Sequence, residues 1–134
     1  MKLRWKILLV IAAAALCVYA FGATPRANMK KFYDGYNEEY FANSLPDATV
    51  SWGDLTSIGD IAVTYLHKDG TIDIIVDRRK NPSTRQAQAS LLHEMCHVAT
   101  WPASDGPKDD PDHGAKHEAC MLRLAEQGAM KGVW

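Results

Sequence analysis

The chain is poor in cysteine and contains neither internal repeats nor tracts of low complexity. Three cysteines in 134 residues are too few for a small domain built on a disulfide framework. An apolar content of 47% is ordinary for a globular protein, which excludes disordered and fibrous classes. The length allows one domain with a modest core and is too short for two.

Positive charge is also scarce once the first 23 residues are set aside. The remainder holds 12 of the 15 Lys and Arg residues and all 16 Asp and Glu residues, a net charge of −4. Nucleic-acid binders need a basic surface that displaces counterions from phosphate. The composition therefore argues against a nucleic-acid partner.

One long apolar run is present, from residue 7 to residue 23, and it follows Lys2, Arg4 and Lys6. A basic start, an apolar stretch and small residues near its end are typical of a secretory signal. The run also reaches the lower limit for a membrane span, about 17 residues. We therefore expect residues 1–23 to be a signal peptide or an N-terminal membrane anchor, and residues 24–134 to be the functional domain. The protein would be exported or membrane-anchored, in the cell envelope or outside the cell.

Hydrophobic periodicity predicts an α+β domain. Aromatic residues recur at three- and four-residue steps between residues 27 and 44, which indicates an amphipathic helix. The segments 48–55, 60–67 and 71–79 are rich in β-branched residues, and Asp69-Gly70 between the last two is a hairpin signal. We expect a small, three-stranded, mostly antiparallel sheet.

Two further helices are predicted after the strands. The first has Asn81 as a candidate N-cap and Pro82 in the first helical position, and should end between residues 99 and 101. An irregular loop over residues 102–112 precedes a final helix over residues 113–130. Its expected apolar positions are Ala119, Leu122, Leu124 and Ala125.

The stretch "HEMCHVATW", residues 93–101, carries ionisable groups within an otherwise apolar helix. Burial of such groups is costly unless they are paired or bound to a metal. His93 and His97 stand four residues apart and leave the same helix face, where one tetrahedral zinc ion can take both nitrogens. Glu94 is rotated by about 100° from His93 and can take a proton from water beside the metal. H-E-x-x-H on a helix is the signature of zinc metallopeptidases.

A catalytic zinc needs a third protein ligand and an open fourth position. Downstream candidates are His113, His117 and Glu118, with the weaker candidates Asp109, Asp110 and Asp112. Four histidines at the metal would close the site and make it structural.

These motifs together resemble the SprT-like zinc metallopeptidase domain. "LLHEMCHVATW", an acidic loop and "DHGAKH" look like its pattern, which is H-E-x-x-H, a loop and H-G-x-x followed by an aromatic residue. The resemblance extends upstream through "NEEYF", "SWGDL" and "IDIIV". It implies His93, His97 and His113 as zinc ligands and Glu94 as the catalytic acid-base.

The chain departs from that pattern at His117, which stands where the family has an aromatic residue. We expect His117 to pack there or to orient a ligand, with the closed four-histidine site as the alternative. The acidic domain and the export-like segment do not suit the DNA-repair role of intracellular family members. Cys96 and Cys120 can pair in an oxidising compartment, although two small buried apolar residues are the favoured interpretation.

The sequence thus predicts a zinc-dependent peptidase that cleaves peptide bonds in a protein substrate through a zinc-activated water, with Glu94 as general base. The competing hypothesis is a non-enzymatic zinc-binding module. The N-terminal segment is the expected contact with a membrane, and the oligomeric state is left open.

Overall fold

The structure is a computed structural model that describes residues 26–101 and 113–133. The expected leader or anchor, residues 1–23, and the irregular loop 102–112 lie outside these ranges. Within the described ranges no helix is both long enough and apolar enough to cross a membrane. The elements run in the order α2 (Met29–Phe41), β1 (Thr49–Gly53), β2 (Ala62–Leu66), β3 (Ile72–Asp77), α3 (Thr84–Thr100) and α4 (Ala115–Glu126).

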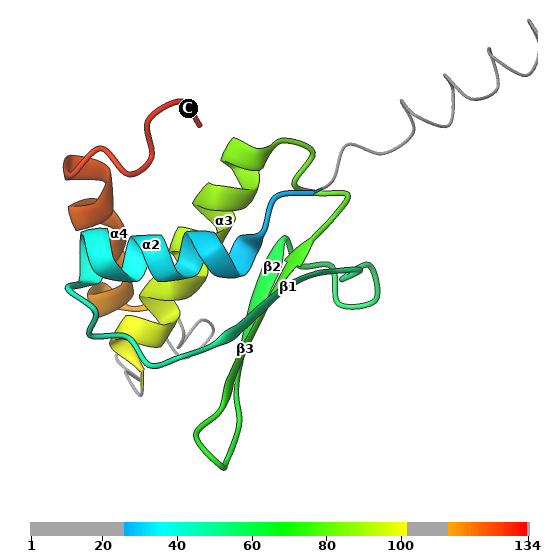
Figure 1. Cartoon of the computed structure of the whole chain (residues 1–134), viewed down its shortest axis with the longest axis horizontal. Coiled ribbons are helices and arrows are strands. Elements are labelled where there is room, and N and C mark those ends of the chain that lie inside the picture. Colours follow the sequence, from blue (N-terminus) through cyan, green and yellow to red (C-terminus); the bar gives the residue numbers. More distant parts are fainter. Residues whose placement is uncertain (1–25, 102–112, 134) are drawn as a thin grey trace, which may run out of the picture.

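Three helices gather on one side of a three-stranded sheet (Figure 1), which confirms the predicted α+β class. Alternate residues of β3, Ile72, Ile74 and Val76, are buried beneath the helices. Leu91 and Leu92 of α3 belong to the same core cluster. Helix α3, which carries the H-E-x-x-H motif, is therefore held against the sheet by the burial of its apolar residues.

The strand order is β1-β3-β2. The sheet is mixed rather than mostly antiparallel, because one of its two pairings is parallel and the other antiparallel. β2 and β3 form the expected antiparallel hairpin, with Gly70 at a φ of 87° in its turn. β1 joins the far edge of β3 and runs parallel to it. A mostly antiparallel sheet of consecutive strands would instead have placed β1 beside β2. β3 takes the central place because it is the most buried of the three strands, and a central position removes both of its edges from solvent.

Helix α3 begins later than expected, because Ser83 rather than Asn81 is its N-cap. Ser83 and Gln86 form a capping box, in which each side chain bonds the backbone of the other residue. The Asn81 side chain is buried and donates to the carbonyls of Ile61 and Asp77 while it accepts from the Ser90 hydroxyl. Asn81 thus ties the β1–β2 loop to the helix and to the end of β3.

The last helix is shorter than the expected 113–130, and of the apolar positions expected in the core Leu124 is buried while the other three are exposed. It buries His117, Cys120 and Leu124, which follow one another at three- and four-residue steps. Leu122, expected in the core, is 60% exposed. In the first two turns the buried residues are a histidine and a cysteine that meet α3, and Leu124 continues the same face.

Candidate metal centre

Helix α3 presents His93 and His97 on one face, four residues apart, with Glu94 beside them. Both histidines are half-buried and Glu94 is buried, because this face of the helix looks across a cavity toward β2. The helical spacing predicted from the sequence therefore places the three side chains at the edge of one cavity.

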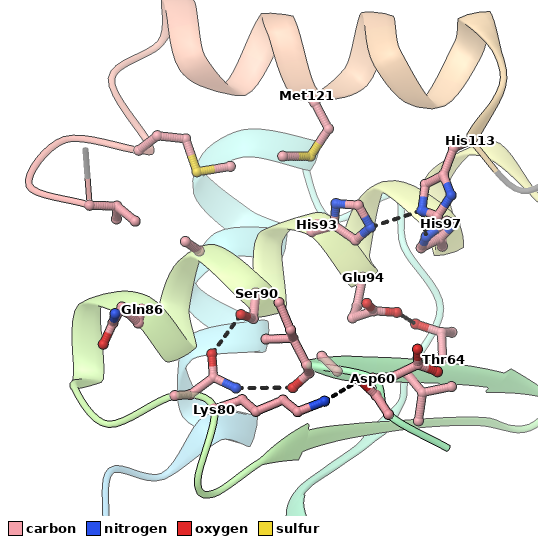
Figure 2. A pocket seen from close by; sticks show the side chains of 18 of the residues that line it. Asp60, Thr64, Lys80, Gln86, Ser90, His93, Glu94, His97, His113 and Met121 are labelled. Carbon is pink, nitrogen blue, oxygen red and sulfur yellow. Dashed lines mark hydrogen bonds between the residues drawn. The ribbon is translucent and has the colours of Figure 1, made fainter. Parts of the chain in front are cut away.

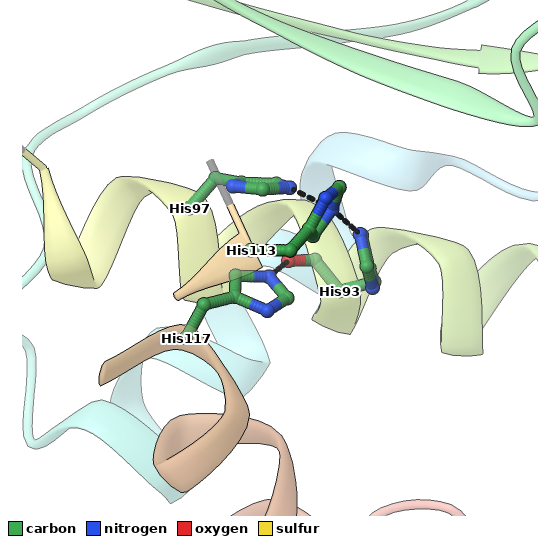
Figure 3. Close-up of side chains that lie close together, drawn as sticks. All are labelled: His93, His97, His113 and His117. Atoms are coloured by element: carbon green, nitrogen blue, oxygen red, sulfur yellow. Dashed lines mark hydrogen bonds between the residues drawn. The ribbon is translucent and has the colours of Figure 1, made fainter. Parts of the chain in front are cut away.

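Helix α4 brings two more histidines to the same place. His113 lies just before the helix, and its Nε2 atom is 3.1 Å from the Nε2 atoms of both His93 and His97 (Figure 3). His117 is buried against the same group, and its Nε2 atom lies 3.1 Å from the backbone oxygen of His93. One ligand atom from each of the four histidines lies within 4.8 Å of the others.

The geometry of this cluster fits a metal ion. At a Zn–N distance of about 2.05 Å, tetrahedral ligands stand about 3.3 Å apart, close to the separations at His113. An imidazole nitrogen carries either one proton or one lone pair, so the Nε2 atom of His113 cannot form two good hydrogen bonds at once. A cation shared by the three nitrogens satisfies all of them, and neutral imidazole is a ligand that suits zinc.

Glu94 lies between the histidines of α3 and the sheet (Figure 2). The hydroxyl of Thr64, in β2, donates to its Oε2 atom over 2.6 Å. Burial raises the pKa of the Glu94 carboxyl, and the bond from Thr64 and the nearby His113 oppose this shift. The carboxylate is thus fixed in orientation and is more readily protonated than an exposed glutamate.

The cavity beside these residues has a volume of about 840 Å³. Glu94, His93, His97 and His113 lie on its wall. β2 and α4 face each other across it, with Met121 of α4 reaching in opposite the sheet (Figure 2). The rest of the wall is largely apolar and includes Ile61, Ala62, Val63, Ala89, Met121 and Met130. Pockets of about 300–1,000 Å³ are the usual size for ligand sites.

A family model covers nearly all of this architecture. The SprT-like family model matches residues 29–132, from the first residue of α2 to beyond α4. The chain belongs to the SprT-like family. No curated protein matches it significantly. The resemblance inferred from the two histidine motifs is confirmed.

One feature of this SprT-like domain differs from the sequence-based interpretation, and one of the downstream candidate ligands can be set aside. Cys96 and Cys120, interpreted as two unpaired buried residues, form a disulfide between α3 and α4. Glu118, a candidate third ligand, is exposed and does not belong to the histidine cluster. The weaker candidates Asp109, Asp110 and Asp112 lie outside the described residues.

Proposed function

We propose that this SprT-like domain is a zinc-dependent metallopeptidase. The observation that supports the proposal is the meeting of three imidazole Nε2 atoms, with that of His113 3.1 Å from those of both His93 and His97, beside the buried carboxylate of Glu94 on a cavity wall. Metal ligands, a candidate base and room for a substrate thus occur together. The family assignment points to the same class of protein.

In this proposal His93, His97 and His113 hold the ion. A bound zinc supplies a Lewis acid for the scissile carbonyl and lowers the pKa of a coordinated water to near 7. The buried His117 donates its Nε2 proton to the His93 backbone oxygen, and so steadies the helix that carries two of the ligands. Ligands oriented by such neighbours bind metal more tightly, commonly by 10–100-fold.

Glu94 acts as general base in the same proposal. Its carboxylate is aimed by the Thr64 hydroxyl, and it takes a proton from the attacking water and returns it to the departing amine. Burial assists this role because a raised pKa brings the carboxyl closer to the neutral range in which it can both accept and release a proton.

We further propose that the substrate is a protein or peptide and that the enzyme works in the cell envelope or outside the cell. The cavity volume of about 840 Å³ suits several side chains of a polypeptide. The location rests on the leader-like sequence of residues 1–23. The Cys96–Cys120 disulfide supports it, since disulfides persist in oxidising compartments.

A second candidate function is a closed, structural zinc site. It is favoured by the place of His117, which offers one ligand atom within 4.8 Å of a ligand atom from each of the other three histidines. A fourth protein ligand would fill the position that a catalytic ion keeps open. The domain would then bind zinc and hydrolyse nothing.

Replacement of the candidate base separates these functions. We expect about one zinc per chain in the protein, and cleavage of a fluorescent casein that stops with a chelator. Glu94→Gln should keep the zinc and lose activity by about 10²–10⁴-fold, the range of general-base catalysis. The matched control is Glu118→Gln, because Glu118 follows His117 as Glu94 follows His93 but is exposed.

Equal cleavage by Glu94→Gln and the parent would remove Glu94 from the mechanism. The closed site predicts a different set of results: zinc-loaded parent protein without hydrolysis, and loss of the zinc in His117→Phe. The catalytic site predicts that His117→Phe retains zinc with an affinity reduced by at most about 10–100-fold.

A further inference from the structure

The disulfide between Cys96 and Cys120 joins the two helices that carry the histidine cluster. Both helices have the same local pattern, His-Glu-x-Cys: His93 and Cys96 on α3, and His117 and Cys120 on α4. Residues three apart are neighbours on a helix surface. Each cysteine therefore lies one turn from a histidine of the cluster, and the bond connects the helices directly beside it.

The bond is part of the packed interface between the helices. Cys96 has no exposed surface and Cys120 is 8% exposed. The His93 and His117 rings, one turn away, are also in contact, with centroids 4.6 Å apart. The ring contact and the disulfide form two adjacent layers of one helix–helix interface.

Among the residues that the structure describes, the buried side chains in the first half of α4 are those that meet α3. Its N-cap is Gly114, which has no side chain to bond the first free backbone N–H groups. His117 and Cys120 are the buried residues of its first two turns, and the next is Leu124. The later part is held by Leu124 and by Arg123, which donates to the backbone oxygen of Tyr40. Without the disulfide, the turn that follows His113 would therefore be the less restrained end of α4.

We propose that the Cys96–Cys120 disulfide is a positioning element of the metal centre, and that the protein binds zinc tightly only when this bond is formed. The bond fixes His113 and His117 of the α4 end against His93 and His97 of α3. The inference rests on the proposed zinc site. It makes zinc affinity depend on the redox state of the two cysteines. The domain acquires tight zinc binding in a compartment where the disulfide can form, and the reduced domain binds zinc weakly.

The reduction itself is a two-electron step. A phosphine reductant in water converts the disulfide to two thiols and becomes the phosphine oxide, with the oxygen and both protons supplied by one water. Since both cysteines are buried, we expect the reduction to be slow in the native protein.

Zinc dissociation constants, measured by competition with a chromophoric chelator, test the proposal. Cys96→Ala/Cys120→Ala should bind zinc at least about 10-fold more weakly than the oxidised parent, as expected when the support of a ligand is removed. Ile74→Ala is the matched control, because Ile74 is a buried residue of the central strand, so its truncation should lower thermal stability while the disulfide between the helices is kept. Its zinc affinity should equal that of the parent below its melting temperature.

A second measurement covers the case in which the double variant fails to fold. The parent, loaded with zinc beside the competing chelator, is reduced with the phosphine while free thiols, zinc release and far-ultraviolet circular dichroism are followed. Zinc should leave as two thiols per chain appear, while the helical signal remains. Retention of zinc by a fully reduced, folded chain, or equal affinities of the double variant and the parent, would overturn the proposal. Absence of zinc binding by the oxidised parent would instead refute the proposed function.

Discussion

The disulfide should also contribute strongly to the free energy of unfolding, and this effect can be calculated. Cys96 and Cys120 are 24 residues apart, so the bond closes a loop of that length in the unfolded chain. The loop-entropy relation gives about 12 cal/mol/K for such a loop, or about 3.4 kcal/mol at 25 °C. Since total stabilities of such domains are about 5–15 kcal/mol, removal of the bond should be readily measured.

The assay is reversible thermal and guanidinium unfolding of metal-free protein, in chelator, so that zinc adds nothing to the stability. A domain of this size loses about 4 °C of melting temperature per kcal/mol, so we expect a fall of about 14 °C. The slope of unfolding free energy against denaturant should rise, because an unfolded chain without the cross-link exposes more surface.

Two forms of the protein separate loop closure from packing. The reduced parent keeps both sulfur atoms, whereas Cys96→Ala/Cys120→Ala also removes them from the core. Any extra loss in the alanine variant is therefore a packing cost, expected to be about 1 kcal/mol or less per site because each change is small. A reduced parent that melts within about 3 °C of the oxidised protein would refute the loop-entropy reasoning.

The local elements of this fold were readable from the sequence, and their long-range pairing was not. The aromatic period predicted α2, and Asp69-Gly70 predicted the hairpin. Each of these signals is made by residues that are close together in the sequence. That β1 lies beside β3 depends on contacts between residues more than 20 positions apart, and no turn signal specifies such a contact. The missed capping box, Ser83 with Gln86, was local and could have been found.

At the site, spacing predicted the pair on α3, and only tertiary packing brings α4 to it. The sequence nevertheless held a clue to the disulfide. If His93 and His117 approach the same centre, the residues one turn after each of them become candidate neighbours, and these are Cys96 and Cys120. Interpreting the cysteines apart from the histidines hid this relation. The role of Asn81 was hidden for another reason, since its partner Ile61 is 20 residues away.

The remaining predictions concern ligand identity and two carboxyl groups with opposite pKa shifts. His113→Ala should weaken zinc binding by more than the 10–100-fold typical of residues that merely support a ligand, whereas Glu118→Ala should leave it unchanged; chelator competition decides, and the opposite ranking would mean a glutamate-ligand site. Hydrogen bonds from the backbone of Leu55, Lys80 and Arg79 lower the pKa of buried Asp77. Its ionised form therefore stabilises the fold above the unfolded-state pKa, and this contribution is lost as the pH falls through the folded-state value. Asp77→Asn should accordingly be destabilised at pH 7 and approach the parent in acid. The contribution of Glu94 to folding stability depends on pH in the opposite direction, because burial raises the pKa of its carboxyl. In metal-free protein its contribution is present below the unfolded-state pKa and is lost as the pH rises through the folded-state value. Metal-free Glu94→Gln should therefore be more stable than the parent at pH 7, and this advantage should shrink as the pH is lowered. Denaturant unfolding at a series of pH values measures both effects. A Glu94→Gln protein that is less stable than the parent at pH 7, and recovers in acid, would show that the bond from Thr64, and not desolvation, dominates at this carboxyl.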